Sequence, residues 1–129
     1  YLRFVVLEPG CKGRLGRLHV ETIRTPHMKR DPSLALKLSI DGKTIAFSGD
    51  SGWTDELVRF TAGADLFMCE CTYYESTELD FHLNYPLIAE KRASFDVGRM
   101  VLTHIGREVF NHESKVEMEL AFDGMKIQL

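Results

Sequence analysis

The sequence predicts an α/β fold built around a mixed β-sheet. Two observations support this fold class: residues 34–47 carry a β-hairpin pattern, and residues 44–102 alternate short apolar runs with helical segments. The chain has 129 residues, of which 44% are hydrophobic and 27% are charged, as in an ordinary globular domain or a part of one. No apolar run reaches the length of a membrane span, so we expect no membrane partner.

The first half of the chain is predicted to form strands. Residues 1–7 are a short apolar strand candidate, and residues 17–25 alternate apolar and polar side chains. Residues 34–40 alternate strictly, and residues 44–47 follow as the next strand. The Asp41-Gly42 pair between them favours a tight turn with positive dihedral angles, which predicts a hairpin.

The second half is predicted to alternate helices and strands. Thr54 can cap a helix that ends near Gly63, and a buried strand follows at residues 66–69. A second helix is expected over residues 84–93, and a third buried strand over residues 100–102. The pair Asp123-Gly124 near the end predicts a second hairpin turn.

Ionisable side chains follow the three strands of this second half. Because strand–helix–strand crossovers leave the strands parallel, Asp50, Glu70 and His104 are expected at one edge of the sheet. His27 follows another predicted strand and is a candidate to join them. Asp and His are suitable ligands for zinc or a similar divalent ion. The alternative for each residue taken singly is a turn, a cap or a structural histidine.

The cysteines and the net charge limit the compartment and the partners. Cys11, Cys69 and Cys71 do not make a disulfide framework, which indicates a reducing compartment and favours the cytoplasm. Cys69 and Cys71 flank Glu70 and are interpreted as small buried groups rather than ligands. The net charge of −3 gives no reason to expect nonspecific binding to nucleic acid.

The segments SGDSGWTDEL, GADLFMCE, FHL and MVLTHIG, in this order, resemble the second half of metallo-β-lactamase-fold hydrolases. The resemblance is closest to the branch that contains ribonuclease Z and small phosphodiesterases. It implies an αββα sandwich, of which this chain is one half: a mixed sheet with two main helices and hairpins.

The resemblance also implies a centre of two divalent metal ions, usually zinc, with manganese or iron as alternatives. His27 matches a histidine of the first metal site, Asp50 the carboxylate that bridges both ions, and His104 a late histidine of the second site. We interpret the glycines beside Asp50 as keeping side chains away from the ions.

Glu70 and His82 match a catalytic pair of the ribonuclease Z branch. By this resemblance, His82 donates a proton to the leaving oxygen and Glu70 orients it, a role that suits imidazole with its ordinary pKa of about 6.5. Alternatively, His82 caps the helix that begins near residue 84, and Glu70 only supports the backbone. The stretch lacks the longer His-Ser-Thr motif of ribonuclease Z, which argues against tRNA processing.

The main signature of the family, His-x-His-x-Asp-His, does not occur in the 129 residues. We therefore expect residues 1–129 to be the C-terminal half of a longer, homo-oligomeric enzyme whose N-terminal half carries that motif; alone, the piece should be inactive. The expected function is metal-dependent hydrolysis of a phosphodiester, either a small molecule or RNA. The alternatives are hydrolysis of another ester, a thioester or a lactone, and a noncatalytic binding or assembly domain.

Overall fold

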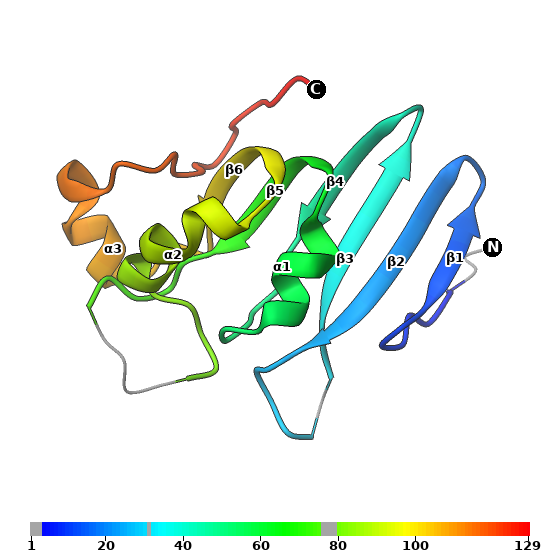
Figure 1. The fold of residues 1–129 in the computed structure, drawn as a ribbon, viewed down its shortest axis with the longest axis horizontal. Coiled ribbons are helices and arrows are strands. Elements are labelled where there is room, and N and C mark those ends of the chain that lie inside the picture. The colour runs from blue at the N-terminus through cyan, green and yellow to red at the C-terminus, as the bar shows by residue number, and fades with distance from the viewer. Residues whose placement is uncertain (1–3, 31, 76–79) are drawn as a thin grey trace.

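The computed structural model describes residues 4–30, 32–75 and 80–129, which form a six-stranded mixed sheet with helices packed on one face (Figure 1). The strands lie side by side in chain order. Neighbouring strands among the first four are antiparallel. The fourth, fifth and sixth strands are parallel to one another. They are β1 (Lys12–Leu15), β2 (Leu18–Thr25), β3 (Ser33–Ile40), β4 (Lys43–Phe47), β5 (Ala64–Glu70) and β6 (Val97–Thr103).

The helices α1 (Asp55–Thr61) and α2 (Tyr85–Lys91) connect the parallel strands. Thr54 caps α1 by accepting a hydrogen bond from the backbone N–H of Glu56, as predicted. Asn84 caps α2 in the same way, through the N–H of Leu87. The remaining helical segments are η1 (Arg92–Ser94), α3 (Arg107–Asn111) and η2 (Glu113–Lys115).

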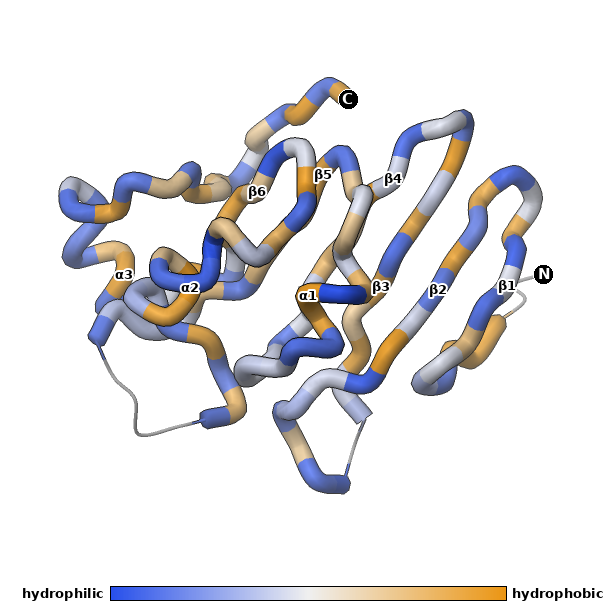
Figure 2. The backbone as a smooth tube through the Cα atoms, viewed as in Figure 1, coloured by the Kyte–Doolittle hydropathy of each residue, from blue (hydrophilic) through white to orange (hydrophobic). Residues whose placement is uncertain are grey.

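The hydrophobic core lies between the sheet and helices α1 and α2. Leu57 of α1 and Ile88 of α2 are fully buried against side chains from the inner strands. Because side chains alternate along a strand, successive residues of a strand face this core and the opposite face of the sheet, and the alternation of apolar and polar residues is visible along β2 and β3 in Figure 2. The strand residues on this face include Ala35, Ala46, Phe67, Cys69 and Leu102.

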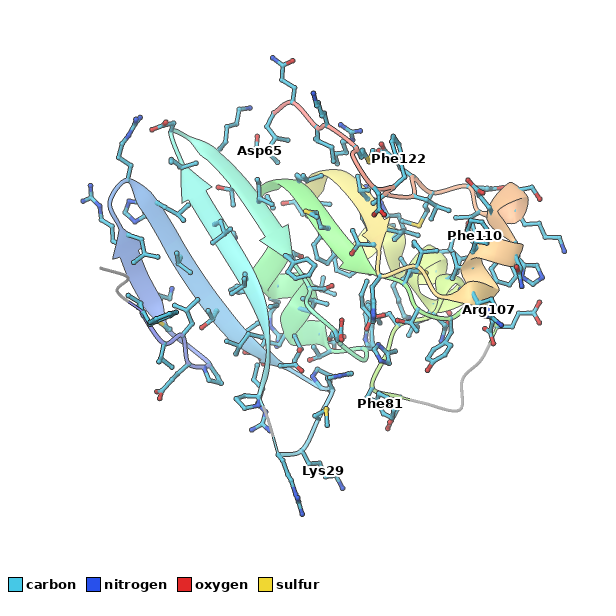
Figure 3. All side chains as sticks on the ribbon, turned by 180° about the vertical axis from the view of Figure 1, so that it is seen from behind. Lys29, Asp65, Phe81, Arg107, Phe110 and Phe122 are labelled. Atoms are coloured by element: carbon cyan, nitrogen blue, oxygen red, sulfur yellow. The ribbon has the colours of Figure 1, made fainter. Side chains whose placement is uncertain are left out.

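The opposite face of the sheet is also apolar. Leu36 pairs with Phe47, and Phe47 pairs with Met68, so three adjacent strands present large side chains there. Leu38 and Ile45 form the next row of the same face. Figure 3 shows this face from behind, and in the part of the chain that the structure describes no helix covers its central strands.

The structure confirms the α/β class and the strand–helix–strand–helix–strand order of the second half. It also confirms the hairpin between β3 and β4. Asp41 and Gly42 both have positive φ angles, of 53° and 79°, as a tight hairpin turn requires.

Two predictions near the ends of the chain are wrong. Residues 4–7 form no strand, and residues 1–3 lie outside the described part. The Asp123-Gly124 pair does make a turn, but no strand flanks it. Instead, the C-terminal segment runs beside β6, where Leu102 exchanges backbone hydrogen bonds with Glu119 and Ala121.

The sequence pattern missed β1 and α3. All four residues of β1 are exposed, so they show no apolar alternation; the strand forms because it pairs with β2. The helix α3 has only five residues, too few to show a helical period. Among the described residues, no helix is long and apolar enough to cross a membrane.

Candidate metal centre

Asp50 lies in the loop that leaves β4, at the edge where the three parallel strands end. The hydroxyl of Thr25, the last residue of β2, donates to the backbone oxygen of Asp50 at 2.9 Å and fixes this loop to the neighbouring strand. The Asp50 side chain is 43% exposed, so its carboxylate faces outward and is accessible to a ligand.

The glycines beside Asp50 are required by the close approach of other backbone segments. A Cβ atom at Gly49, where φ is +59°, would lie 2.4 Å from the backbone oxygen of Leu34. A Cβ atom at Gly52 would lie 1.8 Å from the backbone oxygen of Asp80. The glycines therefore allow two other backbone segments to approach the loop, a steric need that the sequence did not reveal.

His27 and His104 both lie close to the Asp50 carboxylate. The Nε2 atom of His27 lies 3.8 Å from Oδ2 of Asp50, and the Nδ1 atom of His104 lies 3.2 Å from Oδ1. Each carboxylate oxygen thus faces a different imidazole. His104 has a φ angle of +51°, which is uncommon for a residue other than glycine and clusters at functional sites.

The ring orientation of His27 is set by a backbone carbonyl. Its Nδ1 atom lies 3.0 Å from the backbone oxygen of Phe81. Because a carbonyl oxygen only accepts hydrogen bonds, Nδ1 must carry the proton, and the lone pair of Nε2 is then directed toward Asp50. This is the outer support that metal-binding histidines commonly have.

Glu70, the last residue of β5, is almost completely buried, with 1% of its side chain exposed. Its Oε1 accepts the backbone N–H of Ser51 at 2.8 Å. Its Oε2 accepts the N–H of Thr72 at 3.2 Å and the hydroxyl of Thr72 at 2.8 Å. A carboxylate can be buried here because these donors replace water.

His82 completes the cluster and is oriented by Glu70. Its Nδ1 atom lies 2.7 Å from Oε1 of Glu70, and its side chain is 12% exposed. The ring lies between those of His27 and His104, with centroid distances of 4.7 Å and 5.4 Å. The alternative interpretation of His82 as the cap of α2 is wrong, since Asn84 makes that cap.

The predicted site residues therefore come together, and they form two overlapping donor groups. His27, Asp50 and His82 make one, and Glu70, His82 and His104 make the other; within each group, the candidate ligand atoms lie within 4.8 Å of one another. Imidazole nitrogens and carboxylate oxygens are the donors that zinc and similar divalent ions accept. The residue types and their spacing fit a divalent metal site.

Cys69 and Cys71 are not part of this cluster. Both are buried in the core, and burial, followed by the negative charge of Glu70, raises the pKa of the Cys71 thiol to about 12. Burial also raises the pKa of Cys69 well above its usual range. Since metals bind the thiolate, these protonated thiols are poor ligands, as the sequence indicated.

Two contributors to the site carried no sequence signal. The hydroxyl of Thr72 contacts Glu70, His82 and His104, and the backbone oxygen of Phe81 holds His27. A threonine after a strand is common, and every residue has a carbonyl, so neither can be recognised without the tertiary structure.

The fold is that of metallo-β-lactamase-fold proteins, and comparisons with known proteins show the family. The chain belongs to the β-lactamase superfamily, because the family model described as "Beta-lactamase superfamily domain" matches residues 2–105. This finding confirms the resemblance read from the sequence motifs.

Relatives include an uncharacterised protein, Rv1339, of Mycobacterium tuberculosis strain H37Rv, 31% identical over 104 residues that cover 77% of this chain and 38% of Rv1339. Ribonuclease Z of Shouchella clausii is 32% identical over 95 residues, 69% of this chain and 30% of that protein. The crystal structure of the metallo-β-lactamase fold protein YhfI from Bacillus subtilis matches with a TM-score of 0.76 at 20% identity, over 94% of this chain and 54% of YhfI. The chain thus spans less than two fifths of the length of Rv1339 and of the Shouchella clausii ribonuclease Z.

The buried thiol of Cys71 predicts a pH dependence of stability. The folded protein keeps this thiol protonated up to about pH 12, whereas an unfolded chain ionises it near its ordinary pKa of about 8.5. The free energy of unfolding is therefore unaffected below that pH and decreases as the pH rises toward 12. In urea titrations between about pH 8 and pH 11, we expect a steeper decrease for the wild type than for Cys71→Ala, by at most about 1.4 kcal/mol per pH unit. Parallel curves would contradict the burial of a protonated thiol.

Proposed function

We propose that the protein containing this chain is a metal-dependent hydrolase of phosphodiesters, and that these residues supply part of a binuclear centre. One observation carries the proposal: His27, Asp50, Glu70, His82 and His104 come from five segments and converge at the carboxyl edge of the parallel strands. A noncatalytic domain has no chemical need for this combination of donors.

In the proposed centre, His27, Asp50 and His104 would hold the ions. Zinc suits these donors, and manganese or iron are the alternatives. When bound, the ions would supply positive charge to the phosphoryl oxygens and activate a water molecule for attack. The chain's own part is to hold the three ligands in a fixed arrangement, through the Thr25 and Phe81 contacts described above.

His82 is proposed as the proton donor to the leaving oxygen, with Glu70 as its orienting partner. The short contact between His82 Nδ1 and Glu70 Oε1 leaves Nε2 of His82 as the nitrogen that can reach a substrate. Glu70 is held by backbone donors on both oxygens, so it fixes the imidazole without being free to move itself. General acid catalysis of this type contributes roughly 10²–10⁴-fold to rates.

A hollow beside His27 favours an anionic substrate. Its lining includes Arg24 and Lys29 together with Met28 and Phe81, and it also includes one acidic residue, Asp80. Figure 3 shows Lys29 on the loop that projects beyond the sheet, and Phe81 at the same edge. The cationic side chains fit a phosphate, and the apolar ones fit the organic part of its ester. That a relative is named ribonuclease Z supports this substrate class.

We further propose that an N-terminal half of the fold packs on the open apolar face of the sheet and supplies the remaining ligands. Phe47 is 37% exposed on this face, next to Leu36 and Met68. Large contiguous apolar surfaces usually mark an interface. The chain's coverage of about half of YhfI supports the same proposal.

Substitution of Asp50 tests the metal centre. In the full-length protein, Asp50→Ala should abolish most of the bound metal in elemental analysis and lower the hydrolysis of bis(p-nitrophenyl) phosphate at least 100-fold, because the central carboxylate is lost. Asp96→Ala, which removes an exposed carboxylate directly before β6, is the matched control and should change neither. Unchanged metal content and rate in Asp50→Ala would reject the centre and favour the noncatalytic alternative.

Substitution of His82 tests the proton donor. For a diester with an alkyl leaving group, His82→Ala should lower kcat by roughly 10²–10⁴-fold, because the departing alkoxide needs a proton. For a p-nitrophenyl leaving group, which leaves without one, the loss should be much smaller. His19→Ala, on the exposed part of β2, serves as the control. Equal losses on both substrates, accompanied by loss of metal, would identify His82 as a ligand instead.

The proposal of two halves predicts different behaviour for the 129-residue piece and the longer protein. Residues 1–129 alone should bind the dye ANS at the open sheet face and retain less than one metal ion per chain. The longer protein should bind little ANS and two ions. If the isolated piece held two ions and hydrolysed bis(p-nitrophenyl) phosphate as fast as the longer protein, the requirement for another half would be refuted.

A further inference from the structure

We propose that Thr72 is a positioning residue whose hydroxyl joins the Glu70–His82 pair to His104 and fixes the tautomer of His104. The hydroxyl oxygen lies 2.8 Å from Oε2 of Glu70 and 3.2 Å from Nδ1 of both His82 and His104. No other side chain in the described part of the chain is recorded in hydrogen-bond contact with all three. The roles of the histidines rest on the proposed function, but the directions of the hydrogen bonds among these side chains do not.

The single proton of the hydroxyl settles the direction of these contacts. Both oxygens of Glu70 already accept backbone N–H groups, from Ser51 and Thr72, so the carboxylate acts as an acceptor. The Thr72 hydroxyl therefore donates to Oε2 of Glu70, at the shortest of its three distances. Its oxygen can then only accept. The single Nδ1 proton of His82 is directed at Oε1 of Glu70, 2.7 Å away, so the imidazole that donates to the hydroxyl oxygen is that of His104.

The consequence for His104 is a defined tautomer. Its Nδ1 atom faces two acceptors at 3.2 Å, the Thr72 hydroxyl oxygen and Oδ1 of Asp50, so Nδ1 carries the proton. The lone pair is left on Nε2, and Nε2 is the atom of His104 that is available to a metal ion. Without the hydroxyl, Nδ1 would keep only the half-exposed Asp50 carboxylate as a partner.

The backbone around Thr72 is held tightly enough for this task. The backbone N–H of Thr72 donates to the carbonyl of Leu83, in addition to its contact with Glu70. On the other side, a Cβ atom at Gly106 would lie 2.0 Å from the backbone oxygen of Thr72. The glycine therefore lets the segment after β6 pack directly on the Thr72 peptide, two residues beyond His104.

Histidine nitrogen NMR on the metal-free protein tests the proposal. In spectra of ¹⁵N-labelled protein at about pH 8, well above the ordinary pKa of an imidazole, His104 should be the Nδ1–H tautomer. In Thr72→Val, which keeps the shape but removes the hydroxyl, we expect a shift of His104 toward the Nε2–H tautomer that free imidazole side chains favour. Thr72→Ser keeps a hydroxyl and should preserve the wild-type tautomer.

Two results would overturn the assignment: an Nε2–H tautomer of His104 in the wild type, or identical His104 tautomers in wild type and Thr72→Val. The first needs no variant, so the test holds even if Thr72→Val fails to fold. As a second measurement, chelator competition should show metal affinity lowered roughly 10–100-fold in Thr72→Val and little changed in Thr72→Ser. If Asp50→Ala kept all its metal while Thr72→Val still changed the tautomer, the metal centre would fail and the role of Thr72 would stand.

Discussion

A buried carboxylate holds the candidate centre together. Glu70 is almost entirely removed from solvent, and an unpaired charge in such a place would cost several kcal/mol. Its partners come from the loop after β4, the loop after β5 and the segment before α2, through Ser51, Thr72 and His82. The same interactions that make the burial tolerable thus tie three separate loops to one point. A residue that stabilises these loops also orients the imidazole on which the proposed chemistry depends.

The cluster has an inner and an outer layer. Glu70 is buried and the His82 side chain is only 12% exposed, whereas Asp50 and His104 are close to half-exposed. The first pair is shielded from solvent, which suits orientation and proton transfer, and the second pair is accessible to ions and substrate. This division fits the sheet: the β5 strand that carries Glu70 lies between β4 and β6, and the loops after β4 and β5 enclose the Glu70 side chain.

Much of the fold could be predicted from local sequence because its signals are local. The Asp41-Gly42 turn, the Thr54 cap and the alternation along β3 depend on neighbouring residues only, and all three were confirmed. The prediction failed where pairing depends on distant partners. The polar strand β1 exists through β2, and the C-terminal segment follows β6 although its Asp123-Gly124 pair favours a hairpin. The glycines beside Asp50 are likewise required because the backbone oxygens of Leu34 and Asp80, remote in sequence, lie too close to allow a Cβ atom there.

The sequence by itself determined the fold class and the strand–helix–strand–helix–strand order of the second half, and the family resemblance pointed to the five chemical groups of the candidate site. Parallel strands have a common carboxyl edge, so residues that end such strands must meet there. Only the tertiary structure decided which atoms face one another. It placed Nδ1 of His27 on a carbonyl and Nδ1 of His82 on Glu70, and it brought in Thr72, which has no recognisable pattern. The physical reason is that hydrogen-bond direction depends on positions to within a few tenths of an ångström, which spacing along a chain does not encode.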